Sequence, residues 1–258
     1  MDPMGNRGIQ YVASPEISIP GVRKVVVLGD PGCTRFSDGS KEVLAKILSR
    51  EADLYFILGD LAFLDTEEEF REIIDFCNAR VRVPVFALRG NHDLSQYARF
   101  LGRETYALVL DRTVCFFLCN ATGHFAAQDL ELLGQKLNEH KNKNFLILMH
   151  IPPPAPPFRW GLKKEEWEKL RAVLDPHKER VQRILCGHIH GFYEYNADGY
   201  PVTITGGGGA AMIHDARDAV QKVYHSLGLE WRQDGSIFMT FCPVSAASDE
   251  RVSAKTPR

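Results

Sequence analysis

The stretch VRKVVVLGD, residues 22–30, decides the fold: an apolar run ends in a glycine and a carboxylate. An apolar run of this length predicts a buried strand, so Asp30 is expected where that strand ends. The same arrangement, an apolar run followed by a potential metal ligand, recurs at LYFILGD (54–60), FLILMH (145–150) and RILCGHIH (183–190). The repeated pattern places a polar group at the end of each of these predicted strands.

A fifth motif, Gly90-Asn91-His92-Asp93, follows the run PVFALRG (84–90). Carboxylates, an amide and imidazoles gathered at one edge of a sheet are the ligands of a divalent-metal site. Taken singly, Asp30, Asp60 and Asn91 are equally typical of turns and helix caps. Because all five motifs share one structural context, together they favour a metal site.

The order of the segments predicts an α/β fold. Amphipathic helical patterns lie between the apolar runs at residues 41–52, 66–81, 126–141 and 163–174. Strand and helix alternate in the first half of the chain, which implies crossover connections and a mainly parallel sheet. A second series of strands is expected at residues 105–111, 114–120, 144–150, 181–187, 191–196 and 201–207, and Asp234-Gly235 predicts a hairpin within residues 223–242. The two similar halves predict two packed sheets flanked by helices.

Composition predicts one soluble globular domain. The chain has 258 residues, 45% hydrophobic and 25% charged, enough to bury a large core in a single unit. We expect a polar N-terminal arm over residues 1–20, the folded domain over 21–245 and a flexible C-terminal tail over 246–258.

Charge and hydropathy argue against several classes of partner. The formal net charge is −2, which gives no electrostatic case for binding nucleic acid or a membrane surface. The apolar runs are too short to cross a bilayer, and the N-terminus lacks the pattern of a signal peptide. The six cysteines are scattered, as expected of buried thiols in a reducing compartment, so a cytoplasmic location is predicted.

The order of the motifs resembles the calcineurin-like metallophosphoesterases, whose motifs run Asp-x-His, Gly-Asp, Gly-Asn-His-Asp/Glu, His and Gly-His-x-His. The resemblance extends roughly from Val22 to Gly209. It implies a four-layer αββα sandwich with two mixed sheets and a metal site at the carboxyl ends of the strands.

The resemblance also implies a set of ligands for two metal ions. Asp60 would bridge both ions, Asp30 and His190 would complete the first site, and the second would be completed by Asn91, His150 and His188. Divalent or trivalent manganese, zinc or iron suits such ligands. Two adjacent cations can share a hydroxide and hold a phosphoryl group for in-line attack.

Two residues of the Gly90-Asn91-His92-Asp93 motif, the third in chain order, and the preceding Arg89 receive other roles. By resemblance, His92 would protonate the leaving group or stabilise the transition state, and Asp93 would fix the tautomer of His92. Arg89 could neutralise phosphate charge or could be an exposed arginine at a strand end.

The first motif departs from the family pattern, because Gly32 stands where a histidine is expected. Purple acid phosphatases also have glycine there, but they supply a tyrosine three residues after the bridging aspartate. That position is Phe63 in this chain, and phenylalanine cannot ligate a metal. Cys33 is either an unusual ligand or an ordinary turn cysteine. We therefore expect the first site to be weaker, or more readily emptied, than the second.

The proline-rich loop PPPAPPFRWG, residues 152–161, directly follows the motif histidine His150 and its neighbour Ile151. Its side chains Phe158, Arg159 and Trp160 could contact substrate, or the loop could simply cover the fold.

The resulting hypothesis is a hydrolase that cleaves a small phosphorylated substrate by attack of a metal-bound hydroxide. Monoester and diester substrates remain open, as does the oligomeric state. One alternative is a nuclease or RNA-processing phosphodiesterase, although the balanced charge gives it little support. Another is a scaffold that keeps the fold with little or no catalysis, supported by Gly32 and opposed by the retained Asn91 and His92.

Overall fold

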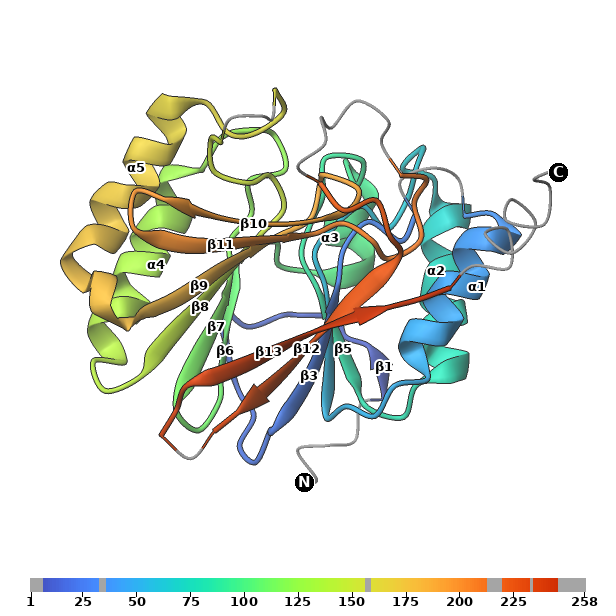
Figure 1. Ribbon diagram of the computed structural model, residues 1–258, viewed down its shortest axis with the longest axis horizontal. Coiled ribbons are helices and arrows are strands. Elements are labelled where there is room, and N and C mark those ends of the chain that lie inside the picture. Colours follow the sequence, from blue (N-terminus) through green and yellow to red (C-terminus); the bar gives the residue numbers. More distant parts are fainter. Residues whose placement is uncertain (1–6, 33–35, 156–158, 213–219, 233, 246–258) are drawn as a thin grey trace, which may run out of the picture.

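Two β-sheets pack face to face between two layers of helices in the computed structural model of the chain (Figure 1). The structure describes residues 7–32, 36–155, 159–212, 220–232 and 234–245. The predicted α/β class, with two mixed sheets in a four-layer sandwich, is confirmed. Among the described helices, none is both long and apolar enough to cross a membrane.

The first sheet has six strands in the order β1-β5-β4-β3-β12-β13. Strands β3, β4, β5 and β1 run parallel, and β12 and β13 close the sheet as an antiparallel hairpin. This hairpin is the one predicted from Asp234-Gly235. The strands are β1 (Gly8–Ile9), β3 (Lys24–Leu28), β4 (Leu54–Ile57), β5 (Pro84–Ala87), β12 (His225–Trp231) and β13 (Ile237–Pro243).

The second sheet has seven strands in the order β10-β11-β9-β8-β7-β6-β2. Its centre, β7, β8, β9 and β11, is parallel, whereas β6 and β10 pair antiparallel with their neighbours β7 and β11. The strands are β2 (Glu16–Ser18), β6 (Tyr106–Val109), β7 (Thr113–Phe117), β8 (Asn144–Met149), β9 (Val181–Cys186), β10 (Phe192–Ala197) and β11 (Tyr200–Thr205).

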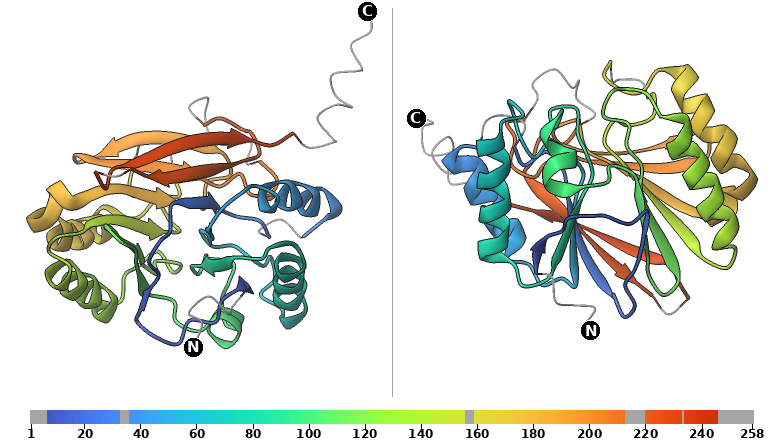
Figure 2. Two further views of the ribbon diagram at one scale, coloured as in Figure 1. Left: turned by 90° about the horizontal axis from the view of Figure 1, so that it is seen from below. Right: turned by 180° about the vertical axis from the view of Figure 1, so that it is seen from behind.

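Helices cover the outer face of each sheet (Figure 2). Helices α1 (Asp38–Leu48) and α2 (Glu67–Arg80) share an apolar core with the first sheet, and α4 (Ala127–Glu139) and α5 (Lys164–Leu174) share one with the second. Helix α2 begins in a capping box: Thr66 Oγ1 accepts from the Glu69 N–H at 3.2 Å, and Glu69 accepts from the Thr66 N–H. The short helix α3 (Gln96–Leu101) and the 3₁₀ helix η1 (Asp175–Arg180) were not expected.

A third apolar core lies between the two sheets. Phe56 of β4 meets Phe117 of β7 edge to face, with ring centroids 5.1 Å apart, and so joins one sheet to the other. The segment expected as an N-terminal arm takes part in both sheets, because β1 and β2 each add a parallel strand at an edge. The two sheets are therefore fixed against each other, which aligns the ends of their strands.

Candidate metal centre

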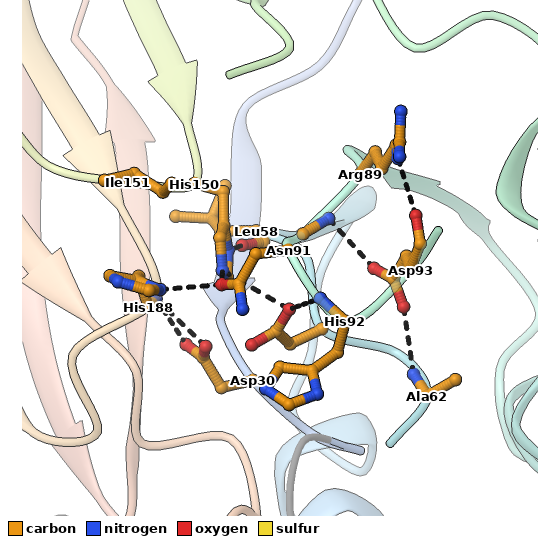
Figure 3. Close-up of polar contacts among 12 residues, drawn as sticks. Asp30, Leu58, Ala62, Arg89, Asn91, His92, Asp93, His150, Ile151 and His188 are labelled. Atoms are coloured by element: carbon orange, nitrogen blue, oxygen red, sulfur yellow. Dashed lines mark hydrogen bonds and ion pairs between the residues drawn. The ribbon is translucent and has the colours of Figure 1, made fainter. Parts of the chain in front are cut away.

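The five motif loops meet at the carboxyl ends of β3, β4, β5, β8 and β9 (Figure 3). Parallel strands end at the same edge of a sheet, and this edge is where ligands bind in open α/β folds. All six side chains predicted as metal ligands are described by the structure, and all six lie in this region: Asp30, Asp60, Asn91, His150, His188 and His190.

The donor atoms form a continuous series of short distances. Potential ligand atoms of Asp30, Asp60 and His150 all lie within 4.8 Å of one another. His150 Nε2 lies 3.3 Å from Asp60 Oδ1 and 2.8 Å from Asn91 Oδ1. The same amide oxygen lies 2.7 Å from His188 Nδ1, and His190 Nε2 lies 3.9 Å from Asp30 Oδ1. Hard oxygen donors and imidazole nitrogens thus face a common point, as a site for a borderline divalent metal requires.

Backbone carbonyls orient two of the imidazoles. His150 Nδ1 donates to the Leu58 carbonyl at 2.7 Å, and His190 Nδ1 donates to the Ala211 carbonyl at 2.6 Å. A hydrogen bond at one ring nitrogen leaves the other, Nε2, facing the carboxylates. The backbone therefore sets which nitrogen of each ring is presented to a metal.

Three of the ligand residues adopt a left-handed backbone conformation. The φ angles are 59° at Asp30, 55° at Asp60 and 68° at His188. This region is unfavourable for residues other than glycine, and such strain concentrates at functional sites. Gly90 permits the close approach of the third motif, since a Cβ there would lie 2.2 Å from Asp60 Oδ1. The loops are thus shaped around the carboxylates at some conformational cost.

Burial and mutual charge set the protonation of the site. Burial raises the pKa of Asp30 well above its usual value, although the charge of His150 opposes it. Burial also acts to raise the pKa of Asp60, but the charge and hydrogen bond of His150 outweigh it, so this pKa falls. Burial lowers the pKa of His188 to about 3 and also lowers that of His190. Neutral imidazoles beside carboxylates are the forms that bind a metal.

His150 behaves differently from the other two histidines. Burial lowers its pKa, but the charge of Asp60 and a hydrogen bond to it raise the value to about 9. Without a metal, a proton on the His150 ring supplies the positive charge beside the carboxylates of Asp60 and Asp30. A bound cation would supply the same charge at this position. The donor set fits a bound metal, because ligation replaces such a proton with a positive ion.

The absence of histidine from position 32, in the first motif, has a steric cause. A Cβ atom at Gly32 would lie 1.8 Å from the carbonyl oxygen of Leu61, well inside van der Waals contact. The Gly32 N–H also donates to the Asp60 carbonyl at 2.9 Å, which holds the two loops together. This backbone excludes the histidine of the family pattern. Cys33, the other candidate ligand, lies outside the described residues.

His92 sits beside the donor set but makes contacts of its own. Its backbone N–H donates to Asp60 Oδ1 at 3.0 Å, and its Nδ1 lies 3.1 Å from the Phe63 carbonyl. Because a carbonyl only accepts, Nδ1 carries a proton, and Nε2 is the nitrogen able to exchange one. The ring of His92 stacks on Phe63, with centroids 5.7 Å apart and an interplanar angle of 21°.

The expected pairing of Asp93 with His92 is wrong. The buried Asp93 carboxylate accepts from the Gly90 N–H at 2.9 Å and from the Ala62 N–H at 3.0 Å, and Figure 3 shows the second of these bonds. Burial, helped by the charge of Asp60, raises the pKa of Asp93 to about 7. Asp93 therefore ties two motif loops together, and the Phe63 carbonyl fixes the tautomer of His92.

Arg89 is not the exposed arginine of one interpretation, and its contact with phosphate stays a prediction. Its Nη1 bonds both oxygens of Glu104, at 3.1 and 3.0 Å, and its Nε donates to the Asp93 carbonyl at 2.6 Å. The side chain is only 16% exposed, and in Figure 3 it lies next to Asp93 and away from Asp30 and His188. Arg89 thus supports the third motif loop and is already neutralised by Glu104.

The proline-rich loop is described in part. Phe158 lies outside the described residues, whereas Arg159 and Trp160 are exposed. His188 is hydrogen-bonded to the backbone of Trp160, and this bond partly opposes the lowering of the His188 pKa by burial. This contact brings the backbone of the loop to the donor set, and substrate contact by its side chains stays a prediction.

Asn120, at the end of β7, is a supporting residue that the sequence did not reveal. Its fully buried amide oxygen accepts from the His150 and Ile151 N–H groups, each at 3.0 Å, and its Nδ2 donates to the Ile151 carbonyl at 2.7 Å. Like the ligand motifs, it is a polar residue at the end of an apolar run. Its place directly after an apolar run was the sign in the sequence that could have identified it.

Comparison with known proteins agrees with this geometry. The sequence model of a family described as calcineurin-like phosphoesterase matches residues 23–192, about two thirds of the chain. The chain belongs to the calcineurin-like phosphoesterase family. As a calcineurin-like phosphoesterase with an assembled set of metal donors, it is in general terms a metal-dependent phosphoester hydrolase.

One sequence relative is described as a probable cyclic nucleotide phosphodiesterase of Coxiella burnetii. It is 25% identical over 176 residues, which cover 62% of this chain and 68% of the relative. Its description applies to that protein.

Solved structures share the calcineurin-like phosphoesterase fold. A purple acid phosphatase from yellow lupin matches with a TM-score of 0.69 and 16% identity over 90% of this chain, which spans 52% of the lupin chain, about half its length. A dimetal phosphatase from Danio rerio matches with a TM-score of 0.65 and 14% identity over 86% of this chain and 96% of the other. An anchor protein of the Plasmodium inner membrane complex, GAP50, matches with a TM-score of 0.62 and 11% identity over 91% of this chain and 95% of the other. At these identities the likeness shows the fold alone.

Proposed function

We propose that the chain hydrolyses small phosphate esters at a centre holding two metal ions. The observation that supports this most strongly is that six donor residues from five loops lie together, joined by short distances that involve Asp30, Asp60 and Asn91. When bound, a pair of cations would lower the pKa of a shared water and neutralise the charge of the phosphoryl group.

Two sets of contacts support the assignment of these donors to two sites. Asn91, His150 and His188 are linked through the Asn91 amide oxygen, at 2.8 and 2.7 Å from the two rings. His190 Nε2 lies 3.9 Å from Asp30 Oδ1. Asp60 lies within reach of both groups, which supports its role as the shared ligand. Asp30 and His190 would thus hold the first ion and the three linked side chains the second.

His92 is the residue proposed to act on the leaving group. Its ring is anchored at Nδ1 by the Phe63 carbonyl, so Nε2 can give or take a proton without the ring reorienting. Its backbone is tied to Asp60, which keeps the imidazole beside the donor set. With both ring nitrogens protonated, His92 would donate the Nε2 proton to the departing oxygen of the ester and keep the Nδ1 proton on the Phe63 carbonyl.

A scaffold function is the second candidate, because Gly32 deprives the first site of one family ligand for a steric reason. GAP50, an anchor protein by its description, has the same fold. Against a scaffold stand the strained backbone angles at Asp30, Asp60 and His188, which a protein-binding surface does not require.

The decisive experiment starts from metal-stripped protein reloaded with manganese, zinc or iron. Activity is measured on monoesters, diesters and cyclic nucleotides, alongside the variants Asn91→Ala and His92→Ala. Metal-dependent turnover that falls at least tenfold in each variant supports the proposal. Equal trace activity in all three proteins with every metal supports the scaffold.

A further inference from the structure

Large apolar side chains are exposed in the two loops that carry Asp60 and His92. Phe63 is 40% exposed, Leu64 68% and Leu94 58%. Single exposed apolar residues are common and need no explanation. These three, which we call the apolar rim, lie three and four residues after Asp60 and two residues after His92, and the ring of Phe63 stacks on that of His92. A cluster of apolar surface at the edge of a polar site is typical of ligand binding.

Polar contacts hold the two loops of the apolar rim together. The Asp65 carboxylate accepts from the Ser95 N–H at 2.6 Å, from Ser95 Oγ at 2.8 Å and from the Gln96 N–H at 3.2 Å. On the first loop, the Leu64 N–H donates to Glu69 Oε2 at 2.9 Å. Asp65 thus fastens the loop bearing Phe63 and Leu64 to the loop bearing Leu94. A surface fixed in this way loses little further freedom when a ligand binds.

Phe63 connects the apolar rim to the reactive side of the site. One face of its ring lies against the imidazole of His92, with centroids 5.7 Å apart and planes 21° from parallel. The ring is still 40% exposed, so it retains accessible apolar surface next to His92. A planar group on the ester oxygen that His92 would protonate therefore comes close to an aromatic surface. Stacking between an aromatic side chain and a planar ring is favourable and tolerant of ring type.

We infer that the apolar rim binds a planar ring on the alcohol portion of the phosphate ester, with Phe63 as the main specificity-determining residue. The inference rests on the proposed function, since it assumes that the ester is held beside His92. The ring could be a nucleobase or an aryl group, because both offer the same flat apolar face. Leu64 and Leu94 would cover the edge of the ring.

Two matched pairs of esters test the inference on the full, metal-loaded chain. Adenosine 5′-phosphate and ribose 5-phosphate share a primary-alcohol leaving group and differ in the base. Benzyl phosphate and cyclohexylmethyl phosphate also share one and differ in the planarity of the ring. The measured quantity is the ratio of kcat/KM within each pair, for wild type, Phe63→Ala and Phe63→Tyr. Within each ratio, any effect of the substitution on His92 cancels.

We expect Phe63→Ala to lower at least one of these ratios about tenfold, mainly through KM, because one stacking contact is lost. Phe63→Tyr should keep the wild-type ratio, since it preserves the ring. Phe238→Ala, which removes an exposed phenylalanine of β13, is the control and should leave both ratios unchanged. A fall in the first ratio alone assigns a nucleobase, and a fall in the second alone assigns an aryl group. If Phe63→Ala leaves both ratios unchanged, the inference is overturned.

Calorimetry separates this inference from the proposed function. Benzylphosphonate and cyclohexylmethylphosphonate cannot be hydrolysed as esters, so their binding requires no turnover. The inference is supported if wild type binds benzylphosphonate more tightly than cyclohexylmethylphosphonate and Phe63→Ala abolishes this difference. That support holds even if the chain hydrolyses none of the four esters, a result that would defeat only the proposed function. Equal binding of the two phosphonates to wild type, with no change in either ester ratio, contradicts the inference.

Discussion

The buried amide of Asn120 is hydrogen-bonded to the backbone of His150: the Asn120 Oδ1 atom lies 3.0 Å from the His150 nitrogen. The same amide also bonds the N–H and the carbonyl of Ile151, so it holds the end of β8. The position of a proposed metal ligand therefore depends on a neighbouring strand of the same sheet. Residues that orient ligands in this way affect metal affinity nearly as strongly as some ligands do.

Replacing Asn120 with alanine should weaken metal binding by roughly 10–100-fold and destabilise the fold by about 1–3 kcal/mol. Three backbone groups at His150 and Ile151 lose their partner, and the imidazole loses its fixed position. Metal titration and thermal unfolding of the metal-free protein measure the two effects separately. Asn138→Ala, at an exposed asparagine of α4, is the control and should change neither. Unaltered metal affinity in Asn120→Ala would show that this amide does not position His150.

Replacing His92 with alanine should lower kcat by about 10²–10⁴, the usual contribution of a general acid, and leave the metal content unchanged. The contact between residue 92 and Asp60 uses the backbone N–H, which alanine keeps. Metal analysis of the purified variant and steady-state kinetics provide the measurement. Loss of a metal ion would instead make His92 a ligand, and unchanged kcat would remove it from the reaction.

Gly32→His should fail to restore the ligand of the family pattern. A side chain at this position meets the Leu61 carbonyl, so we expect a loss of about 2 kcal/mol or more and no gain in metal affinity. Gly39→His is the matched control: within α1, its nearest neighbouring atom would be Ser37 Oγ at 3.8 Å, an ordinary contact. A stable Gly32→His protein that binds the first metal ion more tightly than wild type would refute the steric explanation.

Glu166 gives a pH-dependent contribution to stability that is independent of the metal centre. A hydrogen bond from Lys169, together with His124 and the Phe125 N–H, lowers its pKa to about 2 against the opposing effect of burial. Because the folded-state pKa lies below the unfolded value of about 4.5, this contribution is present above pH 4.5. It is lost as the pH falls from about 4.5 toward 2.

We therefore expect Glu166→Gln to lower the free energy of unfolding by about 1–2 kcal/mol at pH 7, and the difference from wild type to shrink below pH 4.5. Denaturant unfolding in a chelator measures this without a contribution from bound metal. Glu165→Gln changes the adjacent, exposed residue of α5 and should have no effect at either pH. A difference that grows on acidification would reverse the assigned sign.

The sequence predicted the sheets and the ligands because the same residues specify both. Each apolar run forms a strand, and the ligand follows where the strand ends, as at Asp30 and His150. The capping box at Thr66 is another local signal that the structure reproduces. The short strands β1 and β2 carry no periodic pattern, since a strand of two or three residues gains its stability from its neighbour rather than from its own sequence.

The partners of the ligands were harder to predict. The carbonyls of Leu58, Phe63 and Ala211 orient three histidines, and every residue has a carbonyl, so the sequence carries no sign of which one is used. Arg89 and Asp93 were assigned to substrate and to His92 because they adjoin the motif. The side chains of Arg89 and Asp93 hold loops together, which depends on distances between segments far apart in the chain.

The central claim, that six side chains hold a pair of cations, is tested most directly by anomalous diffraction from crystals of the full chain soaked in manganese. The account predicts two peaks roughly 3.5–4 Å apart. Both should contact Asp60, one also lying at Asp30 and His190 and the other at Asn91, His150 and His188. No peak at Asp60, or metal bound instead at the partly exposed group of Glu16, Glu139 and His140, would contradict it.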